Sequence, residues 1–143
     1  MTQEEKDLLI KDLCARLFFG VKVLYNTQIF EVQYIEPMYE EIKLLDNENY
    51  TLSIDEVKPY LFPLSSMTEE QYKYISYNFG RDGLDYIKYG TCDFHSSTLN
   101  IEDIYELVDW LNENHFDYRG LIEKSLALDA TEKRVYEFKL IEK

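Results

Sequence analysis

The chain has 143 residues, of which 45% are hydrophobic and 30% are charged. This length fits one domain, or one small domain with an appendage, and the composition is typical of globular rather than disordered proteins. The formal net charge is −13, from 28 acidic and 15 basic residues. Such an excess of negative charge disfavours a nonspecific grip on nucleic-acid phosphates or on an anionic membrane, and it favours a partner with a basic surface.

The features that report on compartment predict a cytoplasmic protein. Met1 is followed by the letters TQEE rather than by a basic region and an apolar run, and no stretch reaches the roughly 18 apolar residues of a spanning helix. The two cysteines, Cys14 and Cys92, have no paired spacing, so a disulfide framework is not expected. We therefore expect free thiols and no contact with a membrane.

The first part of the chain predicts a helix followed by a meander of strands. Thr2 and Glu5 stand at capping-box spacing and Gly20 follows an apolar repeat, so a helix is expected near residues 3–17. Apolar residues then alternate with polar ones in four runs: Val21 to Tyr25, Phe30 to Tyr34, Ile42 to Leu44, and Tyr50 to Ile54. Turn-forming residues separate these runs, which favours a small antiparallel SH3-like β-barrel or curled sheet. The stretch DEVKPYLFPL, residues 55–64, predicts a short helical turn that ends at its prolines.

The second part of the chain predicts helices. Thr68 and Gln71 repeat the capping spacing, and a helix is expected from there to Gly80. Residues 81–99 are the least regular part, with one short strand considered at Tyr86 to Tyr89. Asn100 caps the clearest helix. Its predicted apolar face consists of Ile101, Ile104, Tyr105, Val108 and Leu111.

The C-terminal part predicts a shorter helix and a last strand. The helix is expected from Tyr118 or Arg119 to about Ser125, and the alternation from Tyr136 to Leu140 indicates the strand. The predicted fold is therefore α+β, with an N-terminal helix and small barrel over residues 1–64. A helical region over residues 65–143, with a final short strand, packs on it to give one compact unit.

The polar residues after the Asn100 helix are candidates for catalysis. His115, Asp117 and Arg119 can do acid or base work in a cleft, or bind an anionic nucleotide. Local structure also accounts for them, because a cation at His115 suits the C-terminal helix dipole and Asp117 can cap a following helix. A helix-turn-helix corner is the favoured interpretation, so we predict no catalytic residue.

A metal site is the second chemical candidate. Cys92 and His95, within CDFH, combine with His115 and Asp117 as potential ligands, but zinc normally takes two well-spaced ligand pairs. The signatures G-x-G-x-x-G, G-x-x-x-x-G-K, H-E-x-x-H and G-x-S-x-G are all absent. We therefore predict neither a metal nor a cofactor.

An acidic stripe is the candidate interaction surface, and it consists of Glu102, Glu106, Asp109 and Glu113. Spacings of four, three and four residues place these side chains on one helix face, roughly opposite the predicted apolar face. No Lys or Arg occurs between Lys88 and Arg119, so the stripe lacks local compensation. One interpretation is a docking surface for a basic protein, with Trp110 as a contact residue. The alternatives are a mimic of nucleic-acid phosphates and a helix face that is simply solvated.

The tyrosines of the predicted sheet form a second candidate surface. Tyr25, Tyr34, Tyr39, Tyr50 and Tyr60 can line an aromatic groove for a peptide or a cationic group. The alternating pattern also explains several of them as core residues.

Three stretches carry a resemblance to a known family: KDLCARLFFGVKV at Lys11 to Val23, VKPYLFPLSSMTEEQ at Val57 to Gln71, and DWLNENHFDYRGLIEKSLALDA at Asp109 to Ala130. They resemble short uncharacterised proteins of gut anaerobic bacteria, often encoded in phage or prophage-like regions. The resemblance covers about a third of the chain and does not extend to Glu31–Tyr50 or Ile75–Ile101. It implies a small intracellular protein of a mobile element, in the cytoplasm of a bacterial host, that binds host or phage proteins.

The function predicted from the sequence is that of a non-enzymatic adaptor or modulator that binds a protein partner through its acidic surface. The first alternative is an acidic nucleic-acid mimic that inhibits a host DNA-binding or defence enzyme. The second is a nucleotide binder or enzyme centred on His115, Asp117 and Arg119. Direct binding to nucleic acid is not expected, and the sequence is compatible with a homo-oligomer.

Overall fold

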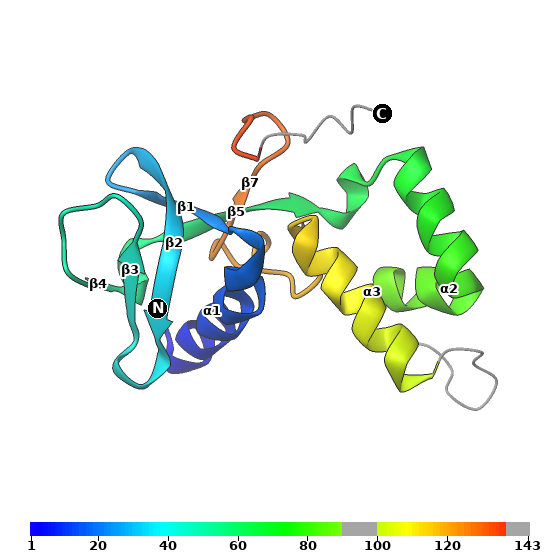
Figure 1. Cartoon of the computed structure of the whole chain (residues 1–143), viewed down its shortest axis with the longest axis horizontal. Coiled ribbons are helices and arrows are strands. Elements are labelled where there is room, and N and C mark those ends of the chain that lie inside the picture. Colours follow the sequence, from blue (N-terminus) through cyan, green and yellow to red (C-terminus); the bar gives the residue numbers. More distant parts are fainter. Residues whose placement is uncertain (90–99, 137–143) are drawn as a thin grey trace.

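The computed structural model describes residues 1–89 and 100–136 and has an α+β fold. Its helices are α1 (Gln3–Arg16), α2 (Glu69–Tyr89) and α3 (Ile101–Glu113). Its strands are β1 (Lys22–Tyr25), β2 (Gln28–Glu36), β3 (Glu41–Leu44), β4 (Leu52–Ser53), β5 (Lys58–Pro63), β6 (Phe116–Asp117) and β7 (Leu128–Asp129). Short 3-10 turns are η1 (Leu17–Phe19), η2 (Pro37–Tyr39), η3 (Ile54–Glu56) and η4 (Leu64–Ser66). Strands β1 to β4 and α1 lie at one end of the molecule, and α2 and α3 lie at the other (Figure 1).

Helix α1 confirms the first prediction. The Thr2 hydroxyl accepts a hydrogen bond from the Glu5 amide at 3.1 Å, and the Glu5 carboxylate accepts one from the Thr2 amide at 3.0 Å, which completes the capping box. Leu9 and Leu13 are fully buried against the sheet. Each buried leucine contributes about 1.5–3 kcal/mol through the hydrophobic effect. The helix is therefore fixed both at its start and along one face.

The four predicted strands are confirmed as an antiparallel meander, but they do not close into a barrel. β1 pairs with β2, β2 with β3, and β3 with β4, all antiparallel. The sheet path runs β4-β3-β2-β1-β5-β6, so β5 adds to β1 and never meets β4. Because β4 has two residues and the chain then turns through η3, the sheet stays open and the SH3-like barrel is corrected to an open mixed sheet.

The helical turn predicted over residues 55–64 is wrong in its main part. Residues 54–56 form η3, but Lys58–Pro63 form β5. β5 pairs antiparallel with β1 and parallel with both β6 and β7. Tyr60 and Leu61 are buried, which gives the continuous apolar run of a central strand instead of an alternating pattern. Pro59 and Pro63 stand near the ends of this strand, where the missing N–H is tolerated.

Helix α2 starts as predicted and continues past Gly80. The Gln71 amide donates to the Thr68 hydroxyl at 3.2 Å, and the Gln71 side chain accepts from the Thr68 amide at 2.8 Å. Gly80 has φ 65° and ψ −162°, which breaks the helix into two segments. A Cβ at Gly83 would lie 2.3 Å from the Phe79 Cβ, so the second segment can pack this closely only with glycine there. The strand considered at Tyr86 to Tyr89 is wrong, because these residues belong to the second helical segment.

The segment after α3 differs most from its prediction. In place of a helix from Tyr118 or Arg119 to Ser125, residues 121–125 form a turn between β6 and β7. Gly120 and Ser125 have φ of 76° and 60°, and these left-handed residues prevent a continuous helix. The helix-turn-helix corner is thus corrected to a helix followed by two short strands. Tyr136 lies outside any strand, and residues 137–140 of the predicted last strand lie outside the described residues.

Two large clusters of buried side chains form the core. The first joins α1 to the sheet and includes Leu121 and Leu126 from the C-terminal part of the chain. The second lies between α2, α3 and β6, with Ile75 and Leu107 at its centre. The C-terminal segment therefore crosses back to the first cluster, and the division at residues 64 and 65 stays a prediction.

The tyrosines of the predicted aromatic groove do not share one environment. Tyr60 is buried within the sheet, Tyr39 and Tyr50 are exposed, and Tyr25 and Tyr34 are half-buried. Tyr25 contacts the Phe30 ring at a centroid distance of 6.3 Å.

Candidate functional site

Helix α3 carries the acidic stripe on an exposed face. The Asn100 side chain accepts a hydrogen bond from the Asp103 amide at 2.8 Å, which confirms the predicted cap. Glu102, Glu106, Asp109 and Glu113 are all exposed, and none forms an ion pair within residues 1–89 and 100–136. The last turn has no basic residue, although the helix dipole disfavours negative charge there. Like charges at these spacings cost about 0.2–0.5 kcal/mol per pair, so local electrostatics opposes the stripe.

The buried face of α3 agrees only in part with the predicted apolar face, which it shares at Leu111. Leu107 and Leu111 are fully buried, whereas Ile101 and Tyr105 are 69% and 68% exposed. Because each residue turns the helix by about 100°, Ile101 and Tyr105 lie more than a quarter turn from the line of Leu107 and Leu111. The apolar residues of α3 therefore lie on two helix faces, of which one is buried and the other is exposed.

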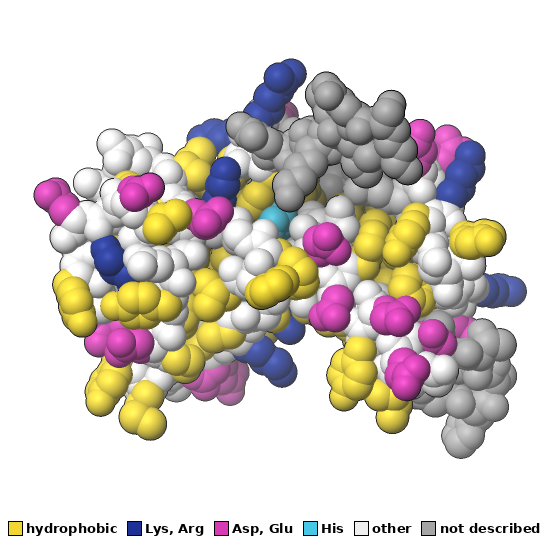
Figure 2. Space-filling view, viewed as in Figure 1, with side chains coloured by type: hydrophobic (Ala, Val, Ile, Leu, Met, Phe, Trp, Pro, Cys, Tyr) yellow, Lys and Arg dark blue, Asp and Glu magenta, His cyan; other side chains and the backbone are white. Residues whose placement is uncertain are grey.

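Aromatic side chains lie on both sides of the acidic stripe. Helix rotation places Tyr105 on one side and Trp110 on the other. Trp110 stacks on Tyr74 of α2 at a centroid distance of 5.3 Å and on Phe116 of β6 at 5.7 Å. Figure 2 shows acidic and apolar side chains side by side on the surface at the α3 end of the molecule. The docking face, defined as the acidic stripe with Tyr105 and Trp110, therefore combines unpaired charge with aromatic surface.

The three residues of the alternative catalytic site have three separate roles in the structure. The Asp117 carboxylate accepts hydrogen bonds from the amides of Leu121 and Ile122, both at 2.9 Å. Asp117 therefore caps a turn, and the helix that it was predicted to cap is absent from the described residues. Arg119 forms an ion pair with Asp12 at 2.8 Å, and the His115 ring stacks on Tyr136. No described hydrogen bond or ion pair joins the three side chains, so they do not form one reacting group.

A buried charge network ties α1 to the segment after α3. Asp12 and Arg16 are both fully buried and form a two-point ion pair at 2.9 and 3.1 Å. Arg16 also donates to the Phe116 carbonyl at 2.6 Å, and Arg119 donates to Asp12 at 2.8 Å. The Tyr118 ring lies beneath both guanidinium groups, at 5.4 Å from Arg16 and 4.5 Å from Arg119.

This network was not predicted from the sequence, and only a weak signal for it exists there. Asp12 and Arg16 have the four-residue spacing of a helical ion pair, which normally marks a solvated face. Asp12 and Arg16 are buried because residues about a hundred positions later, such as Phe116 and Arg119, pack against them. The spacing of residues within α1 does not predict that contact.

His115 is buried, neutral and strained. It is 6% exposed and has φ 59°, a left-handed conformation that glycine usually supplies at a helix C-terminus. Asn114, one residue earlier, has φ −93°, so the chain turns into the left-handed conformation at His115. The imidazole stacks on the Tyr136 ring at 3.7 Å, and its Nδ1 has no hydrogen-bond partner among the described residues. Burial, with the positive charges of Arg16 and Lys22, lowers the pKa of His115 to about 3. A cationic His115 at the helix dipole is therefore a wrong prediction.

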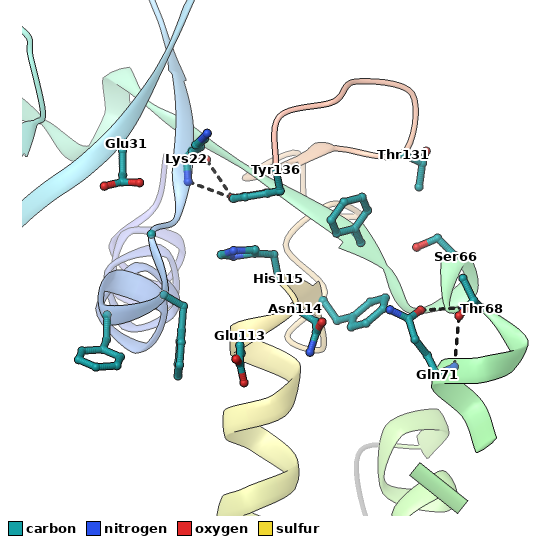
Figure 3. A pocket seen from close by; sticks show the side chains of 15 residues that line it. Lys22, Glu31, Ser66, Thr68, Gln71, Glu113, Asn114, His115, Thr131 and Tyr136 are labelled. Carbon is teal, nitrogen blue, oxygen red and sulfur yellow. Dashed lines mark hydrogen bonds between the residues drawn. The ribbon is translucent and has the colours of Figure 1, made fainter. Parts of the chain in front are cut away.

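A cleft of about 1070 Å³ opens beside His115, between the N-terminal half and the end of α3. Its aromatic lining comes from Phe18, Phe19, Phe62, Phe116 and Tyr136. Lys22, Glu31 and Glu113 supply its charged groups. The Tyr136 hydroxyl accepts a hydrogen bond from the Lys22 amide at 2.9 Å and donates one to the Tyr60 carbonyl at 2.8 Å, which fixes the ring above His115 (Figure 3). Asp117 and Arg119 do not line this cleft.

The described residues contain no group of three or more His, Cys, Asp or Glu side chains arranged to hold a metal ion. Of the predicted ligand set, Cys92 and His95 lie outside the described residues, while Asp117 is committed to backbone amides. Cys14 is a free cysteine on the surface of α1, and partial desolvation of its thiol by the neighbouring atoms raises its pKa. Within residues 1–89 and 100–136, no helix combines the length and the apolar character that crossing a membrane requires.

Comparisons with known proteins gave no match: no protein-family model fits the chain, and no curated protein or solved structure is similar to it.

Proposed function

We propose that the chain is a non-enzymatic protein-binding module whose docking face holds a basic surface of a partner protein. One observation carries this proposal: four exposed carboxylates on α3 have no described ion-pair partner and lie between two aromatic side chains. Carboxylates of this kind steer a cationic partner and select its orientation. Aromatic residues such as Trp110 and Tyr105 are the side chains that most often contribute binding energy at interfaces.

The roles of the catalytic candidates support a binding function over an enzymatic one. Asp117 caps a turn, and Arg119 balances a buried carboxylate. A histidine with a pKa of about 3 is a poor general base near neutral pH, because its conjugate acid gives up its proton too readily. The proposed activity is therefore association rather than turnover.

The nucleic-acid mimic is the less favoured proposal because of where the acidic groups lie. It requires the acidic stripe to continue into acids of the sheet, such as Asp46 and Glu48. These two residues follow β3, at the end of the molecule away from α3 (Figure 1). The exposed acids on α3 thus form a local patch instead of a track along the chain.

The proposed setting is the cytoplasm of a bacterium, in a gene of phage or prophage type. This part of the proposal rests on the resemblance of the three sequence stretches. The proposed partner is accordingly a host or phage protein with a basic surface, and a second copy of the chain would need a basic patch to serve the same role.

A comparison of two charge-reversed variants tests the proposal. Glu106→Lys/Asp109→Lys reverses the docking face, and Asp46→Lys/Glu48→Lys makes the same change in net charge on the β3–β4 loop. Immobilised wild-type chain and loop variant should retain the same basic protein from a lysate of the source organism at low salt, and the α3 variant should lose it. Equal retention by both variants would contradict the proposal, and loss in both would favour the mimic.

A further inference from the structure

The cleft beside His115 has the character of a binding site in its own right. Its volume of about 1070 Å³ is slightly above the usual range of small-molecule pockets, so it has room for a short peptide segment. It adjoins the docking face, because Glu113 and Phe116 line the cleft while Glu113 belongs to the acidic stripe and Phe116 stacks on Trp110. A partner bound to the docking face on α3 would therefore lie beside the opening of the cleft.

An unpartnered polar side chain lies in this cleft. His115 is 94% buried by its exposure of 6%, and its Nδ1 has no hydrogen-bond partner among the described residues. Figure 3 shows the imidazole extending from the end of α3 toward the N-terminal half, under Tyr136. This nitrogen has no accessible surface of its own, because Tyr136 covers the ring, so His115 forms part of the cleft wall and reports on a ligand bound there.

The charged lining favours a cation. Glu31 and Glu113 give two negative charges against the one positive charge of Lys22, and neither carboxylate forms an ion pair within the described part of the chain. The Glu31 carboxylate lies against Gly20, where a Cβ would be 3.1 Å from its Oε1. Gly20 is left-handed with φ 72°, so the backbone both requires a glycine there and leaves room for this carboxylate.

The aromatic lining favours a planar cation. Phe18 is 91% exposed and forms an edge-on pair with Phe19 at 5.5 Å. Both phenylalanines line the cleft, so their rings are available to a ligand bound in it. A guanidinium group stacks on such rings and also donates several hydrogen bonds in one plane, which an ammonium group does not do.

We infer that the cleft binds an extended segment of the partner and that an arginine of this segment inserts between Glu31 and Glu113. Its guanidinium donates to these carboxylates, and its plane lies against the phenylalanines. This inference rests on the proposed function, because it names the partner chemistry that continues from the docking face. An anionic nucleotide would meet a net negative lining and is the competing outcome.

Nuclear magnetic resonance titration of the full chain tests the inference. The probes are acetylated and amidated peptides of sequence Gly-Ser-X-Ser-Gly, where X is arginine, lysine or citrulline, and adenosine monophosphate. The arginine peptide should shift the amide resonances of Gly20 and His115 to saturation, and should bind more tightly than the neutral citrulline peptide by about fivefold or more. Equal binding of the two peptides, or shifts from the nucleotide alone, would overturn the inference.

Matched variants locate the site. Glu31→Gln/Glu113→Gln should weaken the arginine peptide by about fivefold or more, while Glu48→Gln/Glu70→Gln, with the same loss of charge at exposed positions outside the cleft, should bind as the wild type. An unchanged affinity in the first variant refutes the assignment. The charge reversal on α3 separates the two proposals: if it abolishes partner retention while the peptides do not bind, the cleft inference fails and the docking proposal stands.

Discussion

The buried charge network gives the sharpest prediction about stability. Asp12 is fully buried and accepts three hydrogen bonds from two arginines, at 2.9, 3.1 and 2.8 Å. Asp12→Ala removes the carboxylate and leaves Arg16, also fully buried, with the Phe116 carbonyl as its only described hydrogen-bond acceptor. Breaking a buried ion pair on one side costs about 3–5 kcal/mol, because the remaining charge stays away from water.

The same geometry predicts an ordered series of variants. The Arg119 side chain is 17% exposed, and its loss leaves the Asp12–Arg16 pair in place, so Arg119→Met should cost about 1 kcal/mol. Asp7 lies on the exposed face of α1, and Asp7→Ala should stay within about 0.5 kcal/mol of the wild type. A double variant, Asp12→Leu/Arg16→Met, should cost less than Asp12→Ala alone, because it leaves no fully buried unpaired charge. Arg119 loses the same carboxylate, but its side chain is 17% exposed.

Urea unfolding followed by the fluorescence of the single Trp, Trp110, measures these differences. With a slope of about 2 kcal/mol per molar urea, Asp12→Ala should lower the midpoint by about 2 M. A loss below about 1 kcal/mol, comparable to that of Asp7→Ala, would show that the network is solvated and that its description as a buried link is incorrect.

Three further predictions concern His115, Tyr136 and the acidic stripe. Below pH 6.5 the unfolded chain protonates His115, whereas the folded chain, in which the pKa of His115 is about 3, does not, so the free energy of unfolding decreases as the pH is lowered through this window. When the pH is lowered from 7 to 5, the wild type should lose about 2 kcal/mol more than His115→Gln in urea unfolding. Equal losses in the two chains would contradict the lowered pKa. Tyr136→Phe leaves the Lys22 amide and the Tyr60 carbonyl without their hydroxyl partner, and it should lower the free energy of unfolding by about 1–3 kcal/mol in the same assay. The control Tyr77→Phe, at a residue that is 91% exposed, should leave the free energy of unfolding unchanged. Glu106→Gln removes the two like-charge pairs that Glu106 forms within the acidic stripe and should raise the unfolding free energy by about 0.4–1 kcal/mol, a gain that 0.5 M salt should reduce. An unchanged or lower stability would show that the charges of the stripe are compensated.

The elements that the sequence predicts correctly are those whose signals are local. The capping boxes at Thr2 and Thr68 and the N-cap at Asn100 depend on residues within one helical turn, and all three are present. The strands of the meander follow from period-two alternation, which depends on neighbours only. The exposure of the acidic stripe is also predicted correctly, because the spacing of its members places them on one face.

The features that sequence reasoning misses depend on contacts between distant segments. β5 is buried between β1 and the short parallel strands, so its apolar run lacks the alternation that marks an exposed sheet. The open sheet follows from the choice of β1 over β4 as the neighbour of β5, which no short pattern specifies. The cleft and the Asp12 network form only when residues 113–119 return to α1 and β5, so their members are scattered along the chain.

Photo-crosslinking from the docking face tests the central claim most directly. Tyr105, 68% exposed beside the acidic stripe, is replaced by p-benzoylphenylalanine, and Tyr50, 82% exposed on the β3–β4 loop, is replaced in a matched chain. The proposal predicts that irradiation in a lysate of the source organism links position 105 to a protein with a basic surface and that Glu106→Lys/Asp109→Lys abolishes the product. Crosslinking of the same protein at position 50, or a product at position 105 that survives the charge reversal, would contradict it.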